Sequence, residues 1–168
     1  AAFAELSTEG GSSAAEAIMT TDTVSKQAVS GTNGWTVGGM AKGAGMLAPA
    51  LATMLVVITT DAVADAATLD SALRAATAQT FDRLDSDGCQ STNDTVLLMA
   101  SGASGVEASA AELTEHVTAV CQDLALQLLA DVGLTAFAQA RAVELPYGRK
   151  RALEIATTLA LDPDMLLL

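Results

Sequence analysis

The sequence predicts an α/β or α+β domain in which apolar strands alternate with amphipathic helices. Two continuous apolar runs rich in β-branched residues, Met54 to Thr59 and Thr95 to Ala100, are typical of strands covered on both faces. Each run is followed by a segment with helical spacing of its apolar residues, Thr68 to Leu84 and Leu113 to Leu128. The order is therefore strand, helix, strand, helix, which favours a sheet layered against helices.

The first part of the chain is predicted to contain a short helix followed by a polar turn. Residues Ser12 to Met19 can form a helix in which Ser12 or Ser13 is the N-cap. The helix leads into the string Thr20, Thr21, Asp22 and Thr23. Short polar side chains of this kind favour turns, so we interpret the string as a turn or the edge of a site.

A further strand is predicted from Trp35 to Met40, after a loop that contains Gly31, Asn33 and Gly34. The segment from Gly38 to Gly45 has four glycines. Glycine permits positive φ values and close approach of the backbone to a neighbour. We therefore expect this segment to leave the strand and form a backbone-lined loop.

The two longer helices are predicted from their apolar spacing. In the first, the apolar positions are Leu69, Leu73, Ala76, Phe81 and Leu84, and the residues 85–88 (DSDG) end it with turn chemistry. In the second, they are Leu113, Val117, Val120, Cys121, Leu124 and Leu128. These recur at helical intervals and define one buried face.

Composition argues against several classes of function. The chain has 168 residues, with 20 acidic against 8 basic side chains and a net charge of -12. Nucleic-acid binding needs clustered cations, and the basic cluster here is only the short run 149–151 (RKR), which we interpret as a solvated helix start. The N-terminal segment 1–11 lacks the features of a signal peptide, and the apolar run 45–60 is interrupted by Pro49. We expect a cytoplasmic protein with no membrane span.

No metal or cofactor site is expected. Cys89 and Cys121 form no CxxC pair, and His116 is the only histidine, so a zinc site is poorly supported and reduced thiols are expected. His116 is interpreted as an ordinary, partly buried helix residue. The acidic residues Asp82, Asp85 and Asp87 before Gly88 resemble a calcium loop, but the downstream glutamate is missing, so a helix-ending turn is favoured.

Thr53 lies between a glycine- and proline-containing approach and a buried strand, so its hydroxyl would stand at the mouth of the strand. A threonine hydroxyl is a weak nucleophile and needs a base. Chain cleavage before the threonine would supply its own α-amine, which titrates near pH ~8. Residue type alone favours an ordinary strand-entry threonine here.

Several long motifs change that interpretation, because in this order they resemble the ornithine acetyltransferase (glutamate N-acetyltransferase) family. The resemblance covers about residues 14–131. Its motifs are TTDTVSKQAV, WTVGGMAKGAGMLAPALATMLVVITTDA, TFDRLDSDGCQSTNDTVLLMASGASG and VCQDLALQLLAD. The resemblance implies part of a layered α-β-β-α fold and an enzyme of arginine biosynthesis.

The resemblance also implies a reaction and its residues. The family cleaves itself within LATML, here between Ala52 and Thr53, and the new N-terminal Thr53 passes acetyl from N-acetylornithine to glutamate through an ester. Lys42 matches the substrate-binding lysine. Thr20 is the best match for the substrate-binding threonine, with Thr21 and Thr23 as alternatives. The implied partners are these small molecules and either a second copy or further acetyltransferase segments.

Two departures from the family predict impaired turnover. The family's oxyanion-hole Thr-Gly pair has no counterpart in this sequence, and Gly133 stands where the family has a substrate-binding glutamate. Loss of even one oxyanion donor slows acyl transfer by about 10²- to 10³-fold. We therefore expect a domain that carries the nucleophile but not the complete site.

The segment 132–168 is expected to be a separate, truncated unit. LPYGR, from Leu145 to Arg149, resembles the signature motif of a branched-chain amino acid ABC transporter ATPase, and 164–168 resembles the approach to its Walker B strand. The resemblance implies nucleotide contact by Tyr147, Gly148 and Arg149. A P-loop is absent from the sequence, so the alternative function is a non-catalytic chimera or an ATPase-associated fragment.

Overall fold

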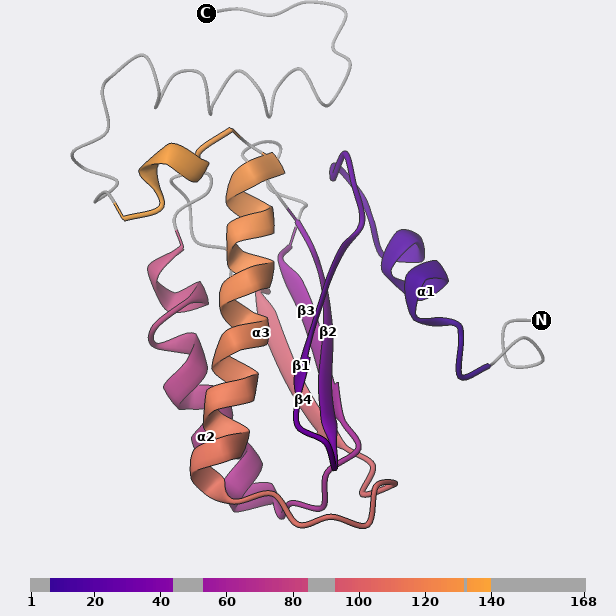
Figure 1. Ribbon diagram of the computed structural model, residues 1–168. Helices are drawn as coiled ribbons and strands as arrows, with labels where there is room; N and C mark the ends of the chain where they lie inside the picture. Colours follow the sequence, from indigo (N-terminus) through magenta and orange to yellow (C-terminus); the bar gives the residue numbers. More distant parts are fainter. Residues whose placement is uncertain (1–6, 44–52, 85–92, 132, 140–168) are drawn as a thin grey trace, which may run out of the picture.

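The computed structural model describes residues 7–43, 53–84, 93–131 and 133–139. In these ranges a four-stranded sheet has two long helices on one face and a short helix on the other (Figure 1). The strands are β1 (Lys26–Gly31), β2 (Thr36–Lys42), β3 (Leu55–Thr60) and β4 (Thr95–Ala100). The helices are α1 (Gly11–Ala17), α2 (Ala66–Thr77) and α3 (Ala110–Asp131), with short 3-10 turns at Phe81–Arg83 and Thr135–Phe137. The predicted mixed α/β class is confirmed.

The sheet is mixed, with the strands in chain order. β2 runs antiparallel to both of its neighbours, β1 and β3. β3 and β4 are parallel, and α2 lies in the connection between them. The register pairs Lys42 with Leu55 and Leu55 with Thr95. The end of β2 and the starts of β3 and β4 therefore lie at one end of the sheet, where the C-terminal end of α3 also lies (Figure 1).

The core lies between the sheet and the pair α2 and α3. All six predicted core positions of the second long helix are buried, which confirms that prediction. The principal core side chains are Val37, Ala41, Val56, Ile58, Ala72, Ala76, Leu113, Val117, Val120, Cys121, Leu124 and Leu128. Full burial of a leucine or valine contributes about 1.5–3 kcal/mol, so this face accounts for much of the stability.

The first long helix begins earlier and ends sooner than its apolar spacing predicts. Asp65 caps α2 by accepting a hydrogen bond from the Thr68 N–H at 2.7 Å. The helix ends at Thr77, and the backbone of Thr80 leaves the helical region. A separate 3-10 turn then buries Phe81. Of the predicted apolar positions, Ala76 and Phe81 are buried by two different elements, and the others, Leu69, Leu73 and Leu84, are partly buried against the core.

Two other predictions are corrected, and one strand lies where none was predicted. The N-cap of α1 is Gly10, with no side-chain hydrogen bond, so neither Ser12 nor Ser13 caps it. β1 was not predicted, because its inward positions Lys26, Ala28 and Ser30 give little hydrophobic signal. β2 continues to Lys42, so the expected glycine-rich loop begins later.

β3 and β4 were expected to be covered on both faces, but among the described residues they alternate. In β3 the side chains of Val56 and Ile58 are buried, whereas Leu55 is exposed. In β4 Leu97 and Met99 are each 49% exposed. The sheet face away from α2 and α3 is therefore open over part of these strands.

α3 packs closely on β2 at Gly39. A Cβ atom on Gly39 would lie 2.7 Å from Val120 Cγ1 and 3.0 Å from Leu124 Cδ1, whereas one on Gly38 would have no atom within 4 Å. We expect Gly39→Ala to lower the free energy of unfolding by about 1–3 kcal/mol, because it overpacks the core. Gly38→Ala should not lower it. Urea denaturation checks the pair, and equal losses would contradict this packing.

Cys121 is the buried thiol of the core. Burial raises the pKa of this thiol to about 12, while a hydrogen bond with the Thr80 side chain acts in the opposite direction. The thiolate is the reactive form, so iodoacetamide at pH ~8 should leave Cys121 unmodified in the folded chain and modify it in denaturant. Peptide mapping measures this. Modification of Cys121 in native buffer as fast as in denaturant would be inconsistent with its burial.

Candidate active site

Lys42 and Thr53 lie at the same end of the sheet. Lys42 is the last residue of β2, and its partner across the ladder is Leu55, two residues after Thr53. Strand separation and rise per residue put the Cα atoms of Lys42 and Thr53 about 8 Å apart if Thr53 continues the line of β3. A lysine side chain can span much of that distance.

With extended backbone from Thr53 to Leu55, the two residues would also share a face of the sheet. Lys42 and Leu55 are register partners, so their side chains project to the same side. Thr53 has the same parity as Leu55 along the chain, and side chains of alternate residues share a face in extended backbone. This face is opposite to α2 and α3, because Ala41 and Val56 face the core.

Two hydrogen bonds hold the backbone directly after Thr53. The Met54 N–H donates to Asp94 Oδ1 at 2.8 Å, and the Met54 carbonyl accepts from the Thr95 N–H at 3.0 Å. The bond to a carboxylate is charge-assisted and stronger than one between neutral groups. Thr53 itself is partly exposed, so its hydroxyl lies at an accessible, anchored end of β3.

Lys42 is a largely buried basic residue of the described part of the chain. It is only 6% exposed. Among the ion pairs within the described ranges, Lys26 pairs with two carboxylates and Arg74 with one, and Lys42 takes part in none. An ammonium at the end of a largely buried side chain, with no carboxylate partner among the described residues, suits an anionic ligand.

The polar string 20–23 is irregular, as predicted, and its threonines differ in what they contact. Thr20 is exposed, and its N–H donates to Asp22 Oδ2 at 3.3 Å. Thr23 is bound to Asp131 through both its N–H and its hydroxyl. The Thr23 hydroxyl is thus used within the fold, which favours Thr20 over Thr23 as the threonine that can meet a ligand.

Behind this turn lies an ion cluster that the sequence analysis missed. Lys26 Nζ lies 2.7 Å from Asp22 Oδ1 and 2.6 Å from Asp131 Oδ2, and all three side chains are almost fully buried. Burial would raise the pKa of Asp22, but hydrogen bonds from Lys26, from the Gly43 N–H and from the Thr20 N–H hold that pKa below its usual value. The available signal was the Asp-Lys spacing of four residues within TTDTVSK.

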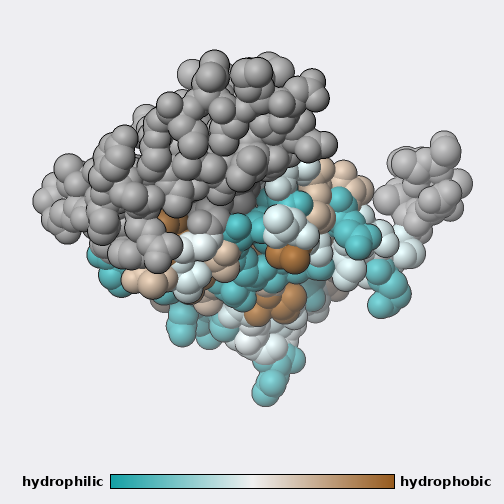
Figure 2. Space-filling view, turned by 90° about the horizontal axis from the view of Figure 1, so that it is seen from above, coloured by the Kyte–Doolittle hydropathy of each residue, from teal (hydrophilic) through white to brown (hydrophobic). Residues whose placement is uncertain are grey.

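Figure 2 looks onto this end of the molecule. The described surface there is largely hydrophilic, with a few hydrophobic side chains among polar ones. Such a surface is compatible with small polar ligands.

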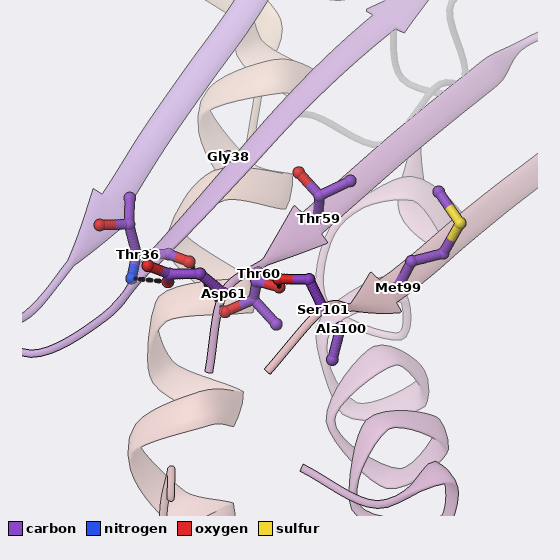
Figure 3. Close-up of a pocket in the computed structure, with 8 residues that line it drawn as sticks. All are labelled: Thr36, Gly38, Thr59, Thr60, Asp61, Met99, Ala100 and Ser101. Carbon is purple, nitrogen blue, oxygen red and sulfur yellow. Dashed lines mark hydrogen bonds between the residues drawn. The ribbon is translucent and has the colours of Figure 1, made fainter. Parts of the chain in front are cut away.

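A hollow of about 450 Å³ lies at the opposite end of the sheet and includes none of the predicted site residues. It is formed where β3 and β4 end and β2 begins, and Asp61 accepts a hydrogen bond there from the Thr36 N–H at 2.6 Å (Figure 3). The side chains of Thr36, Thr59 and Met99 line its open side. The hollow is separate from the Lys42 and Thr53 end.

Of the remaining predicted residues, the structure describes His116 but not those that lie outside its ranges. His116 is half-buried, with its Nδ1 2.8 Å from the Ser30 hydroxyl and its ring edge-on to Trp35, as expected for an ordinary helix residue. The described part of the chain holds no metal-ligating cluster and no helix long and apolar enough to cross a membrane. Outside the described residues lie Ala52, Asp85, Asp87, Cys89, Tyr147, Gly148 and Arg149.

Comparison with known proteins identifies a family. A family model described as the ArgJ family matches residues 1–164. Similar relatives are named arginine biosynthesis bifunctional protein ArgJ. The Streptomyces avermitilis protein is 67% identical over 130 residues, which are 77% of this chain and 34% of the relative. The Mycobacterium leprae protein is 68% identical over 123 residues, 73% of this chain and 30% of the relative.

The chain therefore spans about a third of the length of the curated relatives it matches. The resemblance of the segment 132–168 to an ABC ATPase finds no support, because the family match extends through most of that segment. The division into units 1–131 and 132–168 stays a prediction. With a match over residues 1–164, the chain belongs to the ArgJ family.

Proposed function

We propose that this chain carries the nucleophile and one substrate-binding part of an acyltransferase that moves acetyl from N-acetylornithine to glutamate. The observation that carries the proposal is the register of β2 with β3, which puts Lys42 opposite Leu55 at the end of the sheet where Thr53 precedes β3. Membership of the ArgJ family supports it, as do relatives named for arginine biosynthesis. The substrates are small molecules, the setting is the cytoplasm, and the chain pairs with itself or with further acetyltransferase segments.

In the proposed reaction, the Thr53 hydroxyl first attacks the Ala52 carbonyl, and the C–N bond between Ala52 and Thr53 breaks as the nitrogen takes the hydroxyl proton. Water then hydrolyses the resulting ester, which leaves a carboxylate on Ala52 and frees the Thr53 hydroxyl and α-amine. That amine takes the proton of the Thr53 hydroxyl while the oxygen attacks the acetyl carbonyl of N-acetylornithine. The C–N bond breaks, ornithine leaves with the proton, and an acetyl ester remains on Thr53. The amine of glutamate then attacks the ester and gives a proton to the α-amine. The α-amine passes this proton to the Thr53 oxygen as the ester C–O bond breaks, and N-acetylglutamate leaves.

Lys42 and Thr20 bind substrate in this proposal. The ammonium of Lys42, at the end of the sheet where Thr53 precedes β3, is suited to the α-carboxylate that both substrates carry. The exposed Thr20 hydroxyl can hydrogen-bond the same group or a neighbouring polar atom. The Thr-Gly pair that the resemblance implies as the oxyanion hole has no matched counterpart in this sequence, so we expect acylation of this chain to be slow.

A single-turnover experiment tests the function. The chain is incubated with N-acetyl-L-ornithine and digested, and mass spectrometry locates any acetyl group. We expect one acetyl on the peptide that begins with Thr53, and its loss after addition of L-glutamate. N-acetyl-D-ornithine serves as the matched control and should leave the peptide unchanged. Acetylation elsewhere, or none over a long incubation, would overturn the proposal.

A further inference from the structure

Lys26 joins two segments of the chain that are far apart in sequence. Its ammonium contacts Asp22 in the turn before β1 and Asp131 at the end of α3, and it also donates to the Val24 carbonyl at 3.3 Å. The Lys26 and Asp22 side chains are fully buried, and that of Asp131 is 3% exposed. Both carboxylates therefore pair with the same buried cation, behind the candidate site.

Asp22 connects this cluster to the strand that carries Lys42. Asp22 Oδ1 accepts a hydrogen bond from the Gly43 N–H at 2.8 Å, and Gly43 directly follows Lys42. Gly43 has a φ of 112°, a backbone conformation that favours glycine, and it is the point at which the chain leaves β2. The other oxygen of Asp22 accepts from the Thr20 N–H. One carboxylate therefore holds the backbone beside both Lys42 and Thr20.

We infer that Asp22 is a positioning residue that presents Lys42 and Thr20 to the substrate carboxylate, with Lys26 as its counter-ion. The inference rests on the proposed function for the identity of that ligand. Asp22 is buried and saturated by Lys26, Gly43 and Thr20, so it acts through the backbone and does not touch the substrate. Charge-assisted bonds from backbone N–H groups give this arrangement its rigidity.

The test measures the reactivity of Lys42 in two matched variants. Asp22→Ala and Asp131→Ala each remove one carboxylate from Lys26, but only Asp22 contacts Gly43. Lys42 is labelled with acetic anhydride and quantified by peptide mapping, with circular dichroism as the check on folding. We expect labelling of Lys42 to rise about tenfold in Asp22→Ala, as for loss of a hydrogen bond to a charged group, and less than about twofold in Asp131→Ala.

The conservative variants provide the second comparison. Asp22→Asn keeps an acceptor oxygen for the Gly43 N–H and should give labelling between wild type and Asp22→Ala. If the alanine variants do not fold, Asp22→Asn and Asp131→Asn supply a smaller contrast in the same direction, with more labelling of Lys42 in Asp22→Asn. Equal labelling of Lys42 in the two members of a pair would overturn the positioning role.

L-Glutamate separates this inference from the proposed function. In the wild-type chain, L-glutamate should protect Lys42 from labelling, and in Asp22→Ala this protection should be lost. If L-glutamate gives no protection in the wild-type chain, the proposed substrate role of Lys42 fails. The labelling contrast without glutamate would still decide whether Asp22 positions Lys42.

Discussion

Thr53→Ala is expected to leave the chain whole under conditions in which the wild-type chain cleaves itself before Thr53. Alanine has no hydroxyl, so neither the attack on the preceding peptide bond nor the later acyl ester can occur. Thr53→Ser keeps the hydroxyl and should still cleave, at a changed rate. Intact-mass measurements over time follow the disappearance of the full-length chain.

Thr59→Ala is the matched control for this prediction. Thr59 lies in β3, the strand that follows Thr53, but at the far end of the sheet, where it lines the separate hollow. Its replacement should leave the cleavage rate as in the wild-type chain. Cleavage of Thr53→Ala at an unchanged rate would rule out Thr53 as the nucleophile of self-processing.

Lys26→Met is expected to give the largest loss of stability. The substitution preserves much of the side-chain volume but leaves Asp22 and Asp131 buried side by side without their cation. Removing one partner of a buried ion pair typically costs about 3–5 kcal/mol. Urea denaturation of both chains measures the difference, and Arg74→Met serves as the control because its ion pair with Asp70 is exposed.

The pH dependence of stability provides a further check on the cluster. The pKa of Asp22 is lowered in the folded chain, so its contribution is present above the ordinary carboxyl range and is lost as pH falls through the lower, folded pKa. The Arg74→Met chain should keep this acid dependence, and Lys26→Met should show less of it. A loss of stability in Lys26→Met no larger than in Arg74→Met would contradict the account of the buried cluster.

The strongest periodic signals in the sequence predicted structure well. β4 has the predicted bounds, and every predicted core position of α3 is buried. In these segments the local pattern and the tertiary packing agree, because the apolar face that the spacing defines is the face that packs in the core. The prediction was weaker for α2, where burial of Phe81 is achieved by a separate turn.

β1 shows why local pattern fails elsewhere. Its inward residues include a lysine, which normally indicates an exposed position. Lys26 is buried because Asp131, 105 residues away in the sequence, supplies a second carboxylate. A pairing at that separation leaves no periodicity in the sequence, so both the strand and the cluster were missed.

The candidate site was predicted from a resemblance and not from residue physics. Thr53 is one of many threonines, and its type and neighbours alone favour a strand-entry role. What the structure adds is the register of β2 with β3, which brings Lys42 to the end of the sheet where Thr53 precedes β3. That pairing depends on long-range contacts and could not be derived from the local motifs.

The N-terminal sequence of the processed chain tests the central claim most directly. The purified wild-type chain is incubated, its fragments are separated, and the new N-terminus is sequenced. The account predicts one new terminus that begins with Thr53, Met54 and Leu55, with a free α-amine. A chain that stays whole, or a new terminus at any other residue, would contradict the assignment of Thr53 as an N-terminal nucleophile.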